Sequence, residues 1–238
     1  MQFLLDKLKA PSNEDLLKGY NNMMGVFVPF SLNEQIIKDI KRTYSGMRYF
    51  NPQMSEEGFK KLHRLLVAMS GWKKIGYVQG MNFIAASFLW HCQEEFAYFL
   101  MVQMFEKLKM HEIYSENLQN VEKKAVDFFV GVLGQSGVDI FGDLKQKEIT
   151  PIMILAEWVI TLGFSTVPIE KHMNLMMGLF EGGWNYLFSV LLRYFRTLYP
   201  FFKDHDFADT MQLIKNNGDA RIKQEFGVNL NWETLTKN

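Results

Sequence analysis

The chain has 238 residues, of which 48% are hydrophobic and 22% are charged, and its 26 basic and 26 acidic residues give a formal net charge of zero. A disordered chain combines low hydrophobicity with high net charge, so this composition indicates a folded protein. Nucleic-acid-binding proteins usually have an excess of basic residues, and this chain has none, so the composition does not indicate a nucleic-acid partner. The single cysteine, Cys92, excludes an internal disulfide framework and a cysteine-rich zinc site, and it fits a reducing, cytoplasmic environment.

Helices are predicted along nearly the whole chain. Ser12-x-x-Asp15 and Ser31-x-x-Glu34 have the form of capping boxes, in which a hydroxyl accepts from the backbone N–H three residues later. Apolar spacing of three and four, continuous apolar runs, or proline and glycine at the segment ends predict further helices. Their ranges are 32–43, 55–69, 77–92, 95–108, 116–133, 151–162, 167 to about 183, 184–198 (stopped by Pro200) and 206–216. The last segment, 219–238, is polar and weakly helical. No segment shows strict two-residue alternation, so we expect an all-α fold with one multi-helix domain over residues 1–238 and no sheet.

The longest uncharged stretch, residues 75–93, is long enough to cross a bilayer. It contains Gln79, Asn82, Ser87 and His91, whose polar groups make insertion unfavourable. We therefore expect a helix buried in protein and no transmembrane span. We also expect a cytoplasmic protein that can associate peripherally with membranes through partners.

Motifs for chemistry by the chain itself are missing from the sequence. The five histidines show neither His-x-x-x-His nor His-Glu-x-x-His spacing, so no metal site is predicted. Cys92 ends an apolar segment and is expected to behave as a buried hydrophobic residue rather than as a reactive thiol. No Gly-x-Ser-x-Gly, Gly-x-x-x-x-Gly-Lys-Ser/Thr or Gly-x-Gly-x-x-Gly sequence occurs. We expect no metal, nucleotide or other cofactor bound by this chain alone.

The segment Ile36-x-x-Asp39-x-x-Arg42 places three residues on one side of a predicted helix, because steps of three nearly complete a turn. Asp39 can then hold the guanidinium of Arg42 by a charge-assisted bond. One interpretation is an ordinary exposed ion pair, which contributes only a few tenths of a kcal/mol. The other is an arginine held ready for a partner.

The segment Tyr77-Val78-Gln79-Gly80-Met81-Asn82 enters the uncharged helix with a glutamine. Burying its carboxamide without partners costs about 1–3 kcal/mol. The residue is therefore either a paired structural glutamine or an exposed one that faces a cleft at the start of a buried helix. Gly76 and Gly80 on either side would let another backbone approach.

Together these two segments resemble the TBC domain family, whose members activate GTP hydrolysis by Rab-type small GTPases. Ile36-x-x-Asp39-x-x-Arg42 matches the family's arginine-finger motif, and Tyr77-x-Gln79 matches its glutamine-finger motif. The similarity continues through Gly80-Met81-Asn82-Phe83-Ile84-Ala85-Ala86, and a third region of likeness comprises Glu157-Trp158-Val159-Ile160-Thr161-Leu162, Val167-Pro168 and Glu181-Gly182-Gly183-Trp184. The resemblance covers about residues 20–200.

The resemblance implies an activator of membrane-trafficking GTPases that performs no chemistry on its own. Its partner would be a Rab-type GTPase in the GTP form, which itself binds the GTP and Mg²⁺. By analogy with the family, Arg42 would stabilise charge on the transferring phosphoryl group and Gln79 would orient the attacking water. Asp39 would hold Arg42, and Tyr77 would help to shape the loop.

Two departures from the family pattern leave other functions open. Family members usually begin with a helix that carries an Arg and a Trp, whereas Met1 to Ala10 contain neither, so this helix is shortened. Where the family commonly has Trp-Asp, this chain has Met177-Gly178. The alternatives are a GTPase-binding module that does not accelerate hydrolysis, and a structural subunit of a larger assembly.

Overall fold

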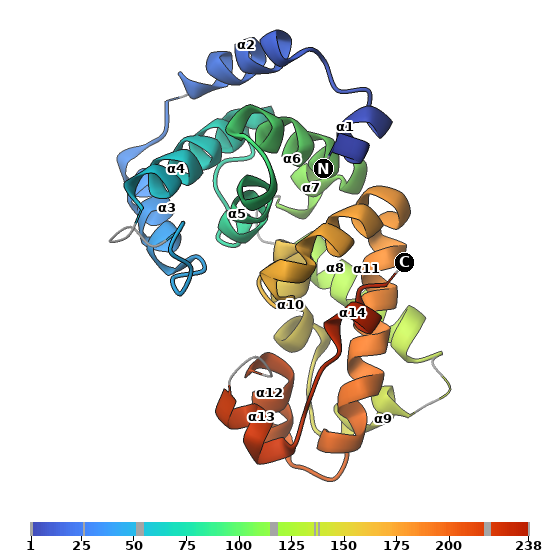
Figure 1. Ribbon diagram of the computed structural model, residues 1–238. Coiled ribbons are helices and arrows are strands. Elements are labelled where there is room, and N and C mark those ends of the chain that lie inside the picture. Colours follow the sequence, from blue (N-terminus) through green and yellow to red (C-terminus); the bar gives the residue numbers. More distant parts are fainter. Residues whose placement is uncertain are drawn as a thin grey trace. The chain divides into compact units, whose positions relative to one another are not determined.

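Helices provide all the regular secondary structure of the described residues. The computed structural model describes residues 2–25, 27–50, 55–114, 119–135, 137, 139–216 and 220–237, and no strand occurs among them. The predicted all-α fold is therefore confirmed. The helices form two compact units, Met1–Ser115 and Glu116–Asn238 (Figure 1). The prediction of one domain over residues 1–238 stays a prediction.

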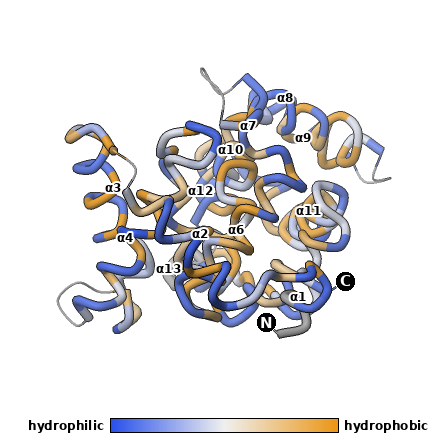
Figure 2. The backbone as a smooth tube through the Cα atoms, turned by 90° about the horizontal axis from the view of Figure 1, so that it is seen from above, coloured by the Kyte–Doolittle hydropathy of each residue, from blue (hydrophilic) through white to orange (hydrophobic). Residues whose placement is uncertain are grey.

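The first unit is built around a short buried helix. Its elements are α1 (Gln2–Lys7), α2 (Asn13–Met24), α3 (Phe30–Arg42), α4 (Glu56–Gly71), a 3₁₀ turn (Trp72–Lys74), α5 (Met81–His91), α6 (Glu94–Leu108) and α7 (Met110–Ile113). Helix α5 contacts α3, α4 and α6, and α2 packs on α4 and α6. Figure 2 shows hydrophobic and hydrophilic residues alternating along α3 and α4, as expected for helices with one buried side.

Helix α5 is buried on nearly all sides, as the uncharged stretch predicted. It is shorter than the expected segment 77–92, because Gly80 adopts a left-handed conformation (φ 113°) and the helix begins at Met81. Residues Tyr77 to Gly80 therefore form a loop that leads into the helix. None of the helices in the described part of the chain has both the length and the apolar character needed to cross a membrane.

Of the two predicted capping boxes, the one at Ser12 is confirmed and the one at Ser31 is not. Ser12 caps α2, and its hydroxyl accepts from the backbone N–H of Asp15 at 3.2 Å. The box at Ser31 was wrong, since α3 begins at Phe30 with Pro29 as its cap. The carbonyl of Pro29 already accepts the first helical bond, from Asn33 at 3.0 Å, so Ser31 lies inside the first turn.

The second unit contains α8 (Gln119–Phe128), a π-helical turn (Phe129–Leu133), α9 (Ile140–Gln146), α10 (Pro151–Thr161), a 3₁₀ turn (Ile169–Lys171), α11 (His172–Phe202), α12 (Phe207–Asn216), α13 (Ala220–Phe226) and α14 (Trp232–Leu235). Helix α8 packs on α10, and α11 contacts α9, α12 and α14. The first three residues of the predicted helix 116–133 lie outside the described residues. Helices α7 and α9 were not predicted.

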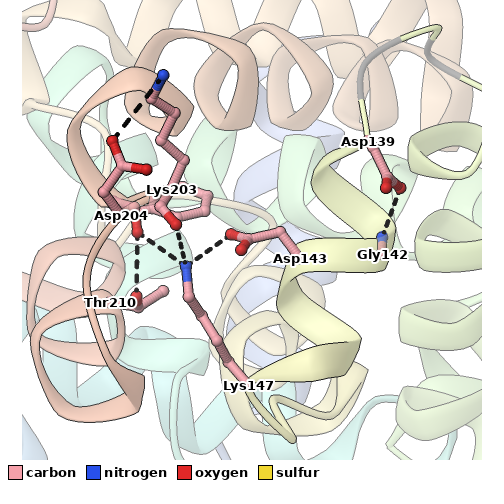
Figure 3. A network of polar contacts seen from close by, with 8 residues as sticks. Asp139, Gly142, Asp143, Lys147, Lys203, Asp204 and Thr210 are labelled. Atoms are coloured by element: carbon pink, nitrogen blue, oxygen red, sulfur yellow. Dashed lines mark hydrogen bonds and ion pairs between the residues drawn. The ribbon is translucent and has the colours of Figure 1, made fainter.

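Helix α11 runs through two predicted boundaries. Gly183 (φ 58°, ψ −137°) kinks it where the sequence predicted an end, but the helix resumes at once. Pro200 was expected to stop it and does not, because α11 continues to Phe202. Lys147 Nζ donates to the carbonyls of Phe202 (2.9 Å) and Lys203 (3.0 Å) and pairs with Asp143 (2.7 Å). Figure 3 shows Lys147 reaching Lys203 and Asp143. A cation on the last carbonyls stabilises the helix end beyond the proline.

The segment 219–238, expected to be polar and weakly helical, forms the short helices α13 and α14 where it is described, and α14 is docked on α11. Trp232 of α14 stacks on Tyr194 of α11, with ring centroids 5.9 Å apart and planes 24° apart. Arg193 Nε donates to the carbonyl of Leu235 at 2.9 Å. These contacts fix the C-terminal turn on α11. Residues 219 and 238 of the expected tail lie outside the described residues.

Candidate functional site

Arg42 ends α3 with an exposed guanidinium and a buried anchor. Ile36, Asp39 and Ile40 lie on the side of α3 that is buried in the first unit. Arg42 Nη2 lies 2.6 Å from Asp39 Oδ1, and the side chains are 56% and 3% exposed. The pair is therefore not the fully exposed ion pair of the simpler interpretation. A buried carboxylate holds a cation that faces solvent.

Gln79 lies in the loop between α4 and α5, where several residues have positive φ. These are Lys73 (47°), Lys74 (57°), Gly76 (70°) and Gly80 (113°). The loop is thereby turned so that Tyr77 is buried and Gln79 is exposed. Within the described part of the chain, no group bonds the Gln79 carboxamide. This residue is not the paired structural glutamine that the sequence left as one alternative.

A single carboxylate joins these two segments. Tyr77 donates its hydroxyl proton to Asp39 Oδ2 at 2.6 Å, while Asp39 Oδ1 pairs with Arg42. Burial, together with the hydrogen bond and negative charge of Asp39, raises the pKa of Tyr77. The phenol therefore remains a protonated donor at neutral pH. Asp39 thus ties the helix that ends in Arg42 to the loop that presents Gln79.

Two further polar residues, to which sequence analysis assigned no role, complete this buried cluster. Asn82 is 1% exposed and Thr43 is fully buried. Asn82 Nδ2 donates to Thr43 Oγ1 at 2.8 Å, and Asn82 Oδ1 accepts from the backbone N–H of Gly80 at 3.0 Å. The available signal was the presence of the amide of Asn82 in a segment predicted to be buried, since buried amides need partners.

Two observations concern metal and thiol groups in the described residues. No group of three or more His, Cys, Asp or Glu side chains among them could hold a metal ion. Burial raises the pKa of the Cys92 thiol to about 12, and Cys92 donates to the carbonyl of Phe88 at 3.3 Å. At neutral pH this thiol is protonated and a poor nucleophile.

The third region of family likeness belongs to the second unit. Trp158 of α10 packs against Tyr194 of α11, with ring centroids 5.3 Å apart. Gly178, which stands in place of the family's Asp, lies against Tyr186: a Cβ at this position would come within 2.1 Å of the ring. Tyr186 in turn donates to the carbonyl of Thr236 at 2.7 Å. The departure at Met177-Gly178 therefore makes room for a tyrosine that binds the C-terminal turn.

Comparison with known proteins identifies the family to which the chain is similar. The model of the Rab-GTPase-TBC domain matches residues 20–202. TBC1 domain family member 4 of Mus musculus is 27% identical over 158 residues, which are 66% of this chain and 12% of that protein. Rab GTPase-activating protein tbc-11 of Caenorhabditis elegans is 23% identical over 188 residues, which are 78% of this chain and 20% of that protein.

A solved structure shows the same fold. The crystal structure of the Ypt/Rab-GAP domain of Gyp1p aligns with a TM-score of 0.73 at 12% sequence identity, over 94% of this chain and 77% of that one. The chain spans no more than a fifth of the length of the two relatives described above. The family model nevertheless covers well over half of the chain. This chain belongs to the Rab-GTPase-TBC domain family.

Proposed function

We propose that this chain stimulates GTP hydrolysis by a Rab-type small GTPase in its GTP form, with Arg42 and Gln79 inserted in trans. The proposal is supported above all by the carboxylate of Asp39, which holds Arg42 and Tyr77 at 2.6 Å each. It is also supported by the family membership, because relatives carry the name Rab GTPase-activating protein.

The chemistry required of an activator matches these two side chains. Phosphoryl transfer to water needs charge stabilisation and positioning rather than covalent help. An exposed guanidinium can bond two phosphate oxygens with its planar fork. An exposed carboxamide can both accept from and donate to a water, and so orient it. Asp39 and Tyr77 act here as supporting residues that touch Arg42 and the loop, not the substrate.

The test is single-turnover GTP hydrolysis by a panel of Rab-type GTPases, with and without this chain. An arginine finger contributes roughly 10³ to 10⁵ in rate, or about 4–7 kcal/mol at 1.36 kcal/mol per decade. Arg42→Ala should remove most of this stimulation, and Arg42→Lys should be nearly as damaging because lysine lacks the planar fork. Gln79→Ala should also reduce it strongly.

Matched controls come from exposed residues of the second unit. Arg196→Ala and Gln212→Ala remove the same side chains at positions outside the proposed site and should leave stimulation unchanged. Binding of the GTP form without any stimulation would instead indicate a binding module. Stimulation that persists in both Arg42→Ala and Gln79→Ala would contradict the proposed mechanism.

A further inference from the structure

Asn82 and Thr43 close a buried ring of polar contacts beneath the two proposed fingers. The ring passes from Tyr77 Oη to Asp39 Oδ2 (2.6 Å), from Tyr77 Oη to Asn82 Oδ1 (3.2 Å), from Asn82 Nδ2 to Thr43 Oγ1 (2.8 Å) and from Thr43 Oγ1 to the carbonyl of Asp39 (2.7 Å). Because the single hydroxyl proton of Tyr77 goes to the nearer, charged Asp39, its approach to Asn82 Oδ1 is a close polar contact and not a second hydrogen bond. Each residue of the ring is at least nine-tenths buried. Two of them end α3 and two belong to the loop and the start of α5.

Donors and acceptors fix the direction of the hydrogen bonds that Thr43 and Asn82 make. The hydroxyl of Thr43 gives its proton to the carbonyl of Asp39, so toward Asn82 it can only accept. The N–H of Gly80 can only donate. The amide of Asn82 must therefore turn its nitrogen to Thr43 and its oxygen to Gly80, and the reverse orientation would set donor against donor.

The bond to Gly80 acts on the backbone of Gln79 itself. The N–H of Gly80 belongs to the peptide group that also contains the carbonyl of Gln79. Asn82 Oδ1 therefore fixes the plane of the peptide that follows Gln79, while buried Tyr77 fixes the chain two residues before it. The carboxamide of Gln79 is thus carried on a backbone held from both sides, although its own side chain has no bond among the described residues.

We propose that Asn82 and Thr43 are positioning residues, which hold the peptide of Gln79 at a fixed place relative to the end of α3 that carries Arg42. The inference rests on the proposed function and deepens it. Thr43 is bonded to the backbone of Asp39, and the side chain of Asp39 holds Arg42. Through Thr43 and Asn82, the water-orienting group and the charge-stabilising group share one rigid support.

Two substitutions of Thr43 distinguish the effect of its hydroxyl group from the effect of its side-chain shape. Thr43→Val keeps the volume but removes the acceptor for Asn82, so the maximal stimulated hydrolysis rate should fall about 10- to 100-fold, the effect of displacing a reacting group by about 1 Å. The concentration of this chain at half-maximal stimulation should change by less than about threefold, since the groups that touch the partner remain. Thr43→Ser keeps the hydroxyl and should restore the rate.

The chain offers a closely matched control for a purely structural effect. Thr236, which directly follows α14 in the second unit, is also fully buried, donates to a carbonyl four residues earlier at 2.7 Å, and faces the amide of Asn174 at 3.5 Å. Thr236→Val therefore removes the same group from a similar setting. It should leave stimulation unchanged while it lowers stability to a similar degree.

A double substitution tests whether Thr43 acts through Gln79. If it does, Thr43→Val combined with Gln79→Ala should be no slower than Gln79→Ala alone. Thr43→Val should also speed amide hydrogen exchange at Gly80 by at least about tenfold, with little change in α6. If Thr43→Val does not fold, Thr43→Ala leaves room for a water beside Asn82 and serves in its place.

The outcomes separate this inference from the proposed function. No stimulation by the unchanged chain would overturn the proposed function, and the positioning role with it. Stimulation that requires Arg42 and Gln79 but survives Thr43→Val at full rate would overturn the positioning role alone. So would a loss in Thr43→Val that adds fully to the loss in Gln79→Ala, because Thr43 would then act elsewhere.

Discussion

Replacing Tyr77 with phenylalanine tests the buried support of the site without reference to any partner. The substitution removes one hydroxyl from a residue that is 7% exposed and keeps the ring in place. Within the described part of the chain, the Tyr77 hydroxyl is the donor to Asp39 Oδ2, and Arg42 pairs with the other oxygen. The variant therefore leaves one oxygen of a buried carboxylate without a donor.

The expected cost follows from that loss. A hydrogen bond to a charged group contributes about 1.5–3 kcal/mol, and an acceptor left buried without a donor incurs its desolvation penalty. We therefore expect Tyr77→Phe to lower the free energy of unfolding by about 2–3 kcal/mol. With a denaturant dependence near 3 kcal/mol per molar urea, the unfolding midpoint should fall by roughly 0.7–1 M.

Tyr20→Phe is the matched comparison, because Tyr20 is 3% exposed and also donates to a buried carboxylate. Tyr20 donates to Glu94 Oε1 at 2.5 Å, but Arg64 Nε also reaches Oε1 at 2.8 Å and Arg64 Nη2 reaches Oε2 at 2.5 Å. Both oxygens of Glu94 thus keep a donor after the substitution. The expected loss is about 1 kcal/mol, the usual value for one hydrogen bond.

The measurement is urea unfolding of the three proteins, followed by circular dichroism and by tryptophan fluorescence to test for a single transition. The prediction is an order of stability, with the unchanged chain first, Tyr20→Phe second and Tyr77→Phe last. Equal losses in the two variants, or a loss below about 1 kcal/mol in Tyr77→Phe, would refute the view that Tyr77 supplies a donor on which Asp39 depends.

Two other variants test packing and pH dependence. Gly178→Ala should destabilise the chain by about 1–3 kcal/mol in urea unfolding, because the added Cβ meets the ring of Tyr186 at 2.1 Å, whereas Gly131→Ala, with nothing within 4 Å, should be neutral or slightly stabilising. Burial, and then the charge of Arg64, lower the pKa of His63, so below about pH 6.5 the unfolded chain binds a proton that the folded chain does not. Stability should therefore fall as pH drops from 7 to 5, and His63→Gln should make that fall smaller; an equally steep fall in the variant would assign the effect to other groups.

The fold could be predicted from the sequence wherever local patterns determine it. Apolar spacing located the helices that became α4, α6 and α10, because an amphipathic helix is encoded in its own residues. Boundaries that depend on distant residues were missed. The clearest example is Pro200, since the stabilising cation on the end of α11 comes from Lys147, 55 residues earlier in the chain.

In the candidate site, too, local contacts could be predicted from the sequence and long-range contacts could not. The pairing of Asp39 with Arg42 could be expected, because residues three apart on a helix are neighbours. The bond from Tyr77 to Asp39 spans 38 residues, and the bond from Asn82 to Thr43 spans 39. Both exist only because α5 packs against α3. Sequence analysis named Arg42 and Gln79 and, through the family resemblance, their buried supports Asp39 and Tyr77. It assigned no role to Thr43 or Asn82 and could not show the contacts that join the two segments.

The tether between Asp39 and Arg42 bears on how quickly an encounter can become productive. A freely rotating arginine side chain carries about 2 kcal/mol of rotamer entropy, which it loses when it is fixed against a ligand. In this chain much of that freedom is lost during folding, because the carboxylate that holds the guanidinium is itself immobile. If the full amount is saved, docking is favoured about 30-fold at 1.36 kcal/mol per decade. The cost of ordering Arg42 is then met once, when the protein folds, and not at every collision.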